Sequence, residues 1–266
     1  MLISVHNLIK RFGQKTILRR LDFNVEQGEF VALLGPNGAG KTTFLRILAS
    51  LSRPTLGEVR IAGHVLPAQA TAVRSRLGVV SHLPLLYGDL TAEENLRFFG
   101  LLYSIPDLRE RISEVLGLIG LLPRRSDLVR TFSRGMQQRL AIGRAVLHDP
   151  EVLLLDEPHT GLDQDACDML DSVLQQVAAR GRTVVMTSHD LARAASLARR
   201  FDVLARGRIQ ASVQRTDLPQ DGLLAFYRQT LEQAKKDDPA GNRAGRGKGK
   251  RMGQGGGEPP GGKKHG

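Results

Sequence analysis

A glycine-rich segment near the start of the chain carries residues suited to phosphate chemistry. It reads Gly35-Pro36-Asn37-Gly38-Ala39-Gly40-Lys41-Thr42-Thr43 and lies between an apolar run and a segment with helical spacing. Glycines let successive backbone N–H groups surround phosphate oxygens at the positive end of a helix. Lys41 would then reach the β- and γ-phosphates, and the Thr42 hydroxyl would ligate Mg²⁺. An ordinary glycine-rich turn is the alternative, but every position of the pattern is matched, so we predict a nucleoside-triphosphate site.

Two more groups of polar residues follow apolar runs of the kind that form buried parallel strands. One run ends in Asp156-Glu157 and the other in Ser188-His189-Asp190. Ligands of open α/β sheets bind at the carboxyl ends of strands, so we expect these groups to meet at the glycine-rich loop. Asp156 would hold Mg²⁺ through water and Glu157 would orient an attacking water. His189 would hydrogen-bond a γ-phosphate oxygen.

The spacing of apolar residues predicts alternating strands and helices around these loops. Strands are expected at 2–5, 17–25, 30–34, 58–61, 77–80, 152–155, 183–187, 201–205 and 209–213, the last two as a hairpin. Helices are expected after the glycine-rich loop and at 134–147, 164–179 and 218–234.

In residues 91–132 the apolar residues have helical spacing throughout, unlike the alternating pattern elsewhere. Thr91 and Glu94 form a capping box, apolar residues follow at helical spacing, and Pro106 opens a second helix. This pattern predicts a helical insertion. Its outer surface is either a docking platform for a partner or a solvated lobe.

The composition limits the compartment and the partners. The 266 residues carry a net charge of +11 and one cysteine, Cys167, so the chain can bury a sizeable core but forms no internal disulfide. Residues 235–266 hold nine Lys or Arg against three Asp or Glu among many glycines, which predicts a disordered basic tail. Residues 1–234 are only mildly basic, so no nucleic-acid binding is expected. Without a membrane span or signal peptide, we expect a cytoplasmic protein.

Over residues 1–230 these motifs resemble, in type and order, the nucleotide-binding subunits of ATP-binding-cassette (ABC) transporters. The signature is Ser133-Arg134-Gly135-Met136-Gln137-Gln138-Arg139, the Walker B strand is 153–157, and the D-loop is Gly161-Leu162-Asp163. The resemblance implies an α/β fold with a P-loop NTPase core and a mostly parallel sheet. It also implies an N-terminal antiparallel β-subdomain and an inserted α-helical subdomain, all within a nucleotide-binding domain over residues 1–234.

The resemblance further implies an ATP-bound homodimer or pseudo-dimer. Two subunits would sandwich two ATP molecules, and the signature and D-loop of one would face the γ-phosphate held by the other. The residues implied in these contacts are Ser133, Gly135 and Asp163. Phe12 would stack on adenine where tyrosine is usual, although a core aromatic at a strand end is the alternative on the residues alone.

The chemistry implied by the resemblance is ATP hydrolysis with Mg²⁺. Glu157 polarises water, with Lys41 and His189 as its catalytic companions, and Thr42 and Asp156 hold the metal. A separate multi-span membrane permease would carry the cargo, and the subunit would lie peripherally on the inner face of the cell membrane.

The sequence departs from the family pattern at two places. Counted from Phe132, Arg134 and Met136 occupy the third and fifth signature positions, where Gly and Gln are commoner. The loop after Val80 has no glutamine through Leu90, where the family places one that contacts Mg²⁺ and water. By spacing, that position falls at His82, or one residue later if one residue is deleted. We therefore expect His82 near the γ-phosphate and Mg²⁺, where it partly substitutes for glutamine.

This loop also bears on the sub-family. Its Ser-His pair and the run from Leu90 to Leu96 are similar to the haem-exporter ATPases of cytochrome c maturation, which predicts a role in haem export. The alternative is the ATPase of a drug, lipid or polysaccharide exporter. A soluble ABC ATPase acting on ribosomes or DNA is disfavoured, because the chain has neither a second cassette nor a long coiled coil. The intact Glu157 and His189 argue against a regulator without turnover.

Overall fold

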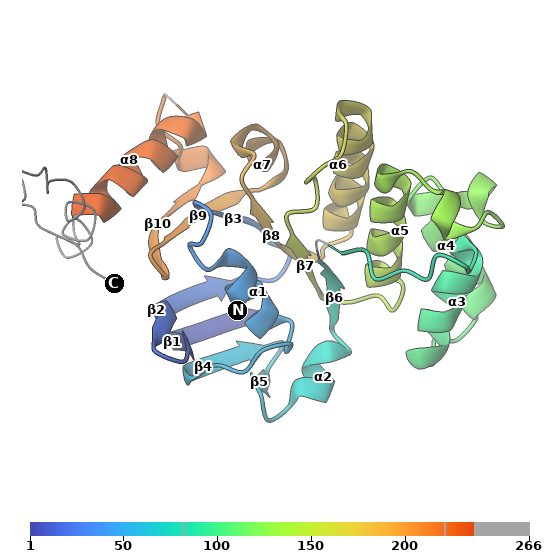
Figure 1. Cartoon of the computed structure of the whole chain (residues 1–266), viewed down its shortest axis with the longest axis horizontal. Helices are drawn as coiled ribbons and strands as arrows, with labels where there is room; N and C mark the ends of the chain where they lie inside the picture. Colours follow the sequence, from blue (N-terminus) through green and yellow to red (C-terminus); the bar gives the residue numbers. More distant parts are fainter. Residues whose placement is uncertain (82, 221, 237–266) are drawn as a thin grey trace, which may run out of the picture.

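The computed structural model describes residues 1–81, 83–220 and 222–236. Two sheets form its centre (Figure 1). The smaller sheet is antiparallel and has the order β2-β1-β4-β5. Its strands are β1 (Ile3–Phe12), β2 (Lys15–Val25), β4 (Leu56–Ile61) and β5 (His64–Leu66).

The larger sheet has six strands in the order β10-β9-β3-β8-β7-β6. All its neighbours are parallel except the hairpin of β9 and β10. The strands are β3 (Phe30–Leu34), β6 (Leu77–Val80), β7 (Val152–Asp156), β8 (Thr183–Ser188), β9 (Arg200–Ala205) and β10 (Arg208–Gln214). The expected P-loop NTPase fold, with a mostly parallel sheet and an antiparallel N-terminal sheet, is confirmed.

Eight α-helices connect and cover the strands in the part of the chain described. They are α1 (Lys41–Leu48), α2 (Ala70–Arg74), α3 (Ala92–Leu102), α4 (Leu108–Leu118), α5 (Arg134–Val146), α6 (Gln164–Ala179), α7 (Leu191–Leu197) and α8 (Gly222–Lys236). Short 3₁₀ turns lie at Leu122–Arg124, Val129–Thr131 and Arg215–Asp217. None of the helices in the described ranges is long and apolar enough to cross a membrane.

The central strand β3 explains why the sequence has an unbroken apolar run here. Its side chains alternate between two hydrophobic clusters, so both faces of the strand are buried. Phe30, Ala32 and Leu34 pack with residues of α5, α6 and the helical insertion. Val31 and Leu33 pack with α1 and the antiparallel sheet. Burial of each large apolar side chain contributes about 1.5–3 kcal/mol, which fixes the strand ends that carry polar residues.

The helical insertion begins as predicted. The Glu94 N–H donates to Thr91 Oγ1 at 3.2 Å, and the Thr91 N–H donates to Glu94 Oε2 at 2.8 Å, so the capping box at α3 is confirmed. The fully buried Asn95 side chain accepts from the Tyr87 N–H at 2.8 Å and donates to the Tyr87 carbonyl at 2.9 Å. This amide therefore fastens the end of the loop after β6 onto the insertion.

Several elements differ from the sequence expectations. Strand β1 was predicted only to Val5 but runs to Phe12. The short elements β5, α2 and α7 were not predicted, and α4 begins at Leu108 rather than Pro106. Helix α8 extends to Lys236, two residues past the predicted domain end at 234. The rest of the predicted tail, 237–266, lies outside the described residues, and so does His82.

Candidate active site

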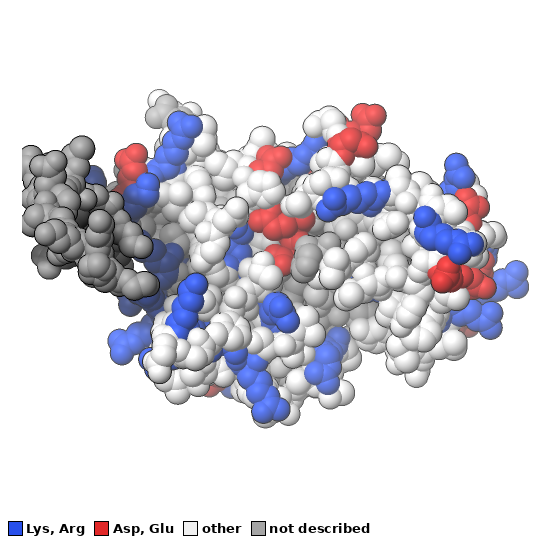
Figure 2. Space-filling view, in the orientation of Figure 1, with Lys and Arg blue, Asp and Glu red and all other residues white. Residues whose placement is uncertain are grey.

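A cavity of about 690 Å³ opens at the carboxyl ends of the parallel strands. It is lined by residues 36–43 together with Lys15, Ile17, Asp156, Glu157, Thr160 and His189. Acidic side chains gather in the middle of this face, and basic side chains lie along its lower edge over the antiparallel sheet (Figure 2). The three predicted strand-end groups therefore meet at one site.

The glycine-rich loop has the backbone that a phosphate cradle requires. Gly38 and Gly40 have φ of 78° and 110°, values that side chains other than glycine's rarely tolerate. A Cβ on Gly35 would lie 2.1 Å from the Leu204 carbonyl oxygen, so this position admits only glycine. No side chain caps the start of α1, and its first N–H groups are left for a ligand.

Lys41 is buried, with a side chain only 6% exposed. Its Nζ donates to the Gly35 carbonyl at 2.7 Å and lies 3.5 Å from Oε1 of Glu157. A buried ammonium is costly unless paired, and these two oxygens pair it. The loop thus holds a preformed cation where a bound triphosphate would need one.

Thr42 and Asp156 bring hard oxygen atoms together from two elements. The Thr42 hydroxyl donates to Asp156 Oδ1 at 3.2 Å. Thr187 on the neighbouring strand also donates to Oδ1, at 2.8 Å. No cluster of three or more His, Cys, Asp or Glu suited to a metal occurs among the described residues. A hydroxyl and one carboxylate fit Mg²⁺, which usually keeps several waters and binds substrate phosphates as well.

Glu157 and His189 face one another at the carboxyl ends of β7 and β8. Nδ1 of His189 lies 2.5 Å from Oε2 of Glu157. The Glu157 side chain is 21% exposed and that of His189 is 64% exposed, so the pair lies at the mouth of the cavity. Glu157 has φ of 52°, and its N–H donates to Thr187 Oγ1 at 2.9 Å. Thr187, which the sequence reasoning did not single out, thus orders both acids.

The signature and D-loop residues lie away from this cavity. Ser133 is exposed and caps α5 by accepting from the Met136 N–H at 3.3 Å. Asp163 caps α6 in the same way, accepting from the Ala166 N–H at 2.8 Å. Gly135 packs against α6, where an added Cβ would lie 2.6 Å from that of Ala166. One chain alone does not place these residues at its own glycine-rich loop.

Phe12 lies at the end of β1 and is 56% exposed, which removes the alternative of a core aromatic. The Nζ atom of Lys10 lies 4.6 Å from its ring centroid. Phe12 is not among the residues that line the cavity. Stacking of a purine on this ring remains a prediction.

Comparison with known proteins identifies the family. The family described as ABC transporter matches residues 18–160. The linearmycin resistance ATP-binding protein LnrL of Bacillus subtilis is 35% identical over 219 residues, covering 82% of this chain and 70% of that protein. The chain belongs to the ABC transporter family. It is an ATP-binding subunit and hydrolyses ATP.

Further relatives of this ABC subunit agree with that assignment. The Nod factor export ATP-binding protein I of Ralstonia nicotianae is 38% identical over 209 residues, covering 78% of this chain and 65% of that protein. A solved ATP-binding subunit of an ABC transporter superposes with a TM-score of 0.79 at 30% identity, covering 87% of this chain and 100% of that chain. A dimeric ATP-binding cassette in a post-hydrolysis state with ADP and Pi gives 0.72 at 28% identity, covering 80% and 99%. None of these proteins is named for haem export, so the haem-exporter resemblance is unsupported.

Proposed function

We propose that this subunit powers export of a drug-, lipid- or polysaccharide-type cargo through a separate multi-span permease. The observation that carries the proposal is the role for which its relatives are named, linearmycin resistance and Nod factor export. Haem export, which the loop after β6 suggested, has no support among those relatives. The exporter alternative raised by the sequence fits them better.

We infer that the cavity residues have separate roles in ATP hydrolysis. The glycine-rich loop and Lys41 hold the triphosphate. Thr42 and Asp156 would hold Mg²⁺, which offsets phosphate charge when it is bound. Glu157 accepts a hydrogen bond from the attacking water and takes its proton as the water oxygen bonds to the γ-phosphorus. The bond from the γ-phosphorus to the bridging oxygen breaks, and ADP leaves. His189, exposed and already next to Glu157, turns its imidazole to a γ-phosphate oxygen.

We also propose that the working unit is a dimer. Ser133, Gly135 and Asp163 lie at helix starts outside the cavity of their own chain, and a second subunit would bring its own copies to it. Dimeric cassettes among the solved structures support this arrangement.

The permease partner is proposed to dock on the helical insertion. This part of the surface exposes several large apolar side chains on and just after α3, and exposed apolar side chains that gather in one patch mark interaction sites. They are Phe98 (39% exposed), Leu101 (64%), Leu102 (68%) and Tyr103 (42%). Such docking would place the subunit on the cytoplasmic face of the membrane.

The cargo class can be tested in cells that lack this subunit. Cells carrying the wild-type chain, the Glu157→Gln chain or no chain would be compared for resistance to a panel of amphiphilic antibiotics, for exported glycans and for haem-stained c-type cytochromes. The proposal predicts that only the wild-type chain restores resistance or glycan export, with cytochromes equal in all three. Loss of c-type cytochromes with unchanged resistance and glycans would instead establish haem export.

A further inference from the structure

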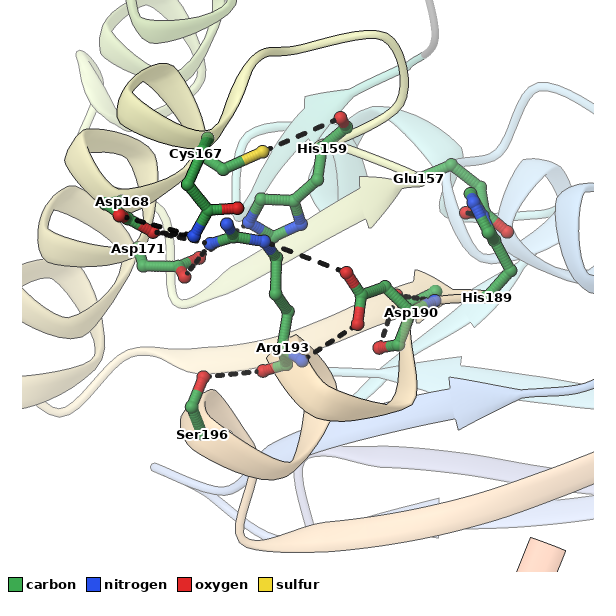
Figure 3. A network of polar contacts seen from close by, with 11 residues as sticks. Glu157, His159, Cys167, Asp168, Asp171, His189, Asp190, Arg193 and Ser196 are labelled. Atoms are coloured by element: carbon green, nitrogen blue, oxygen red, sulfur yellow. Dashed lines mark hydrogen bonds and ion pairs between the residues drawn. The ribbon is translucent and has the colours of Figure 1, made fainter. Parts of the chain in front are cut away.

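A polar network behind the active site joins the two loops that carry Glu157 and His189 (Figure 3). His159 follows Glu157 by two residues, and its Nε2 lies 2.6 Å from Oδ1 of Asp171 on α6. The other oxygen of Asp171 accepts from Arg193 Nη1 on α7 at 2.6 Å. One carboxylate therefore bridges the Walker B loop and the helix that begins just after His189.

Arg193 carries the connection on to the His189 loop. Its guanidinium also donates to Asp168 Oδ1 at 3.1 Å. Its backbone N–H donates at 3.1 Å to the side chain of Asp190, the residue next to His189. The side chains of His159, Asp171 and Arg193 are 8%, 16% and 12% exposed. Removing one member of so buried a network takes a partner from its neighbours, which is costlier than losing a surface pair.

The contact with Asp171 determines which ring nitrogen of His159 carries a proton. A carboxylate only accepts, so Nε2 carries the proton that is shared with Asp171. The other ring nitrogen, Nδ1, is buried and has no hydrogen-bond partner among the residues described. His159 therefore contributes one hydrogen-bond donor, at the Nε2 position. A glutamine amide nitrogen can occupy the same position.

The backbone between Glu157 and Asp163 explains why this donor matters for the acid. Glu157 has φ of 52°, a conformation that persists only when its surroundings enforce it. The Thr160 N–H donates to the Glu157 carbonyl at 3.1 Å, and the Leu162 N–H donates to the His159 carbonyl at 3.2 Å. His159 thus belongs to both of two successive turns, and its imidazole ties them to α6.

We propose that His159 is a positioning residue for ATP hydrolysis. Through Asp171 and Arg193 it holds the Glu157 and His189 loops at a fixed separation, so that the carboxylate and imidazole meet where water must be oriented. This inference rests on the role proposed above for Glu157. It predicts an effect on turnover without an effect on ATP binding, because no member of the network belongs to the glycine-rich loop.

The test is steady-state ATPase kinetics of the full chain with His159→Ala, His159→Gln and His159→Asn. The glutamine amide reaches the Nε2 position, whereas the asparagine amide falls short at Nδ1. We expect kcat to fall roughly ten- to a hundredfold in the Ala and Asn variants, the size of effect produced by a small misplacement of a catalytic group. We expect His159→Gln to recover most of the loss, with KM for ATP unchanged in all three.

His148→Ala is the matched control, because this half-buried histidine also makes one hydrogen bond, to the Leu77 carbonyl, and has a buried unpartnered Nδ1. It should keep the wild-type kcat. Glu157→Gln is measured alongside; if it retains turnover, the role of Glu157 fails rather than the positioning role. If Glu157→Gln is inactive but His159→Ala and His159→Asn keep full kcat, or glutamine restores nothing, the inference is overturned. Where His159→Ala does not fold, the Gln and Asn variants decide.

Discussion

Nδ1 of His189 lies 2.5 Å from Oε2 of Glu157, although 32 residues separate the two. Parallel pairing of β7 and β8 sets Asp156 opposite Thr187, and the next residues of each strand then leave the sheet at the same edge. The acid and the imidazole therefore meet because of strand register. Both side chains line the cavity that the glycine-rich loop also lines.

Replacement of Lys41 by Ala should weaken ATP binding. A charge-assisted hydrogen bond is worth about 1.5–3 kcal/mol, so Kd should rise roughly ten- to a hundredfold. Titration calorimetry with ATP measures this directly. Lys15→Ala is the control, since Lys15 lines the same cavity but is exposed. Equal losses in both variants would contradict a special role for the buried ammonium.

Phe12→Ala should also lower nucleotide affinity, through loss of stacking rather than of charge. Stacking of a base on an aromatic side chain contributes about 1–3 kcal/mol, so Kd for ATP should rise roughly fivefold or more. Phe12→Tyr should bind as well as the wild type. Triphosphate alone, which has no base, should bind all three equally. A uniform Kd for ATP across the series would show that adenine does not stack on this ring.

The site could be predicted where its residues are consecutive and follow a strongly apolar strand. The glycine-rich loop and Asp156-Glu157 are of this kind, because their spacing in sequence fixes their relation in space. Thr187 and Arg193 escaped prediction, since their partners come from strand register and helix packing. The length of β1 was missed for a local reason. Register shifts after Val5, with Asn7 at φ of 49°, break the alternation that identifies a strand.

Acid should destabilise the fold in part through His148. Burial lowers the pKa of this imidazole below its ordinary value of 6.5, and Arg111 adds to the effect. The hydrogen bond to Leu77 and the charge of Asp149 oppose it, and Tyr103 stacks on the ring at 3.9 Å. Because the folded state disfavours the proton, this stability is present above pH 6.5 and is lost as pH falls below it.

Thermal melts at pH 7.5 and at pH 5.5 should therefore differ more for the wild type than for His148→Gln. In a domain of this size each 1 kcal/mol of lost stability lowers Tm by about 2–4 °C, so the excess is measurable as a difference in Tm. Identical pH dependence in the two proteins would exclude His148 as a contributor.

ATP should drive dimer formation when hydrolysis is blocked. Glu157→Gln with ATP and Mg²⁺ should elute as a dimer in size-exclusion chromatography. Adding Ser133→Arg should return it to the monomer, because a bulky cation at the start of α5 obstructs the approach of a second subunit. Adding Thr216→Arg, a matched change at an exposed residue after β10, should leave the dimer intact. If the Ser133→Arg double variant dimerises equally well, the shared site is wrong for the isolated subunit.

The most direct measurement is ATP turnover and ATP affinity of Glu157→Gln, with Glu151→Gln as control. Glu151 precedes the same strand at its opposite end and pairs with Arg76. A general base contributes about 10²–10⁴-fold, so kcat of Glu157→Gln should fall by at least a hundredfold while Kd stays within about twofold. Glu151→Gln should match the wild type in both quantities. Full turnover by Glu157→Gln would contradict the assignment of this carboxylate as the group that activates water.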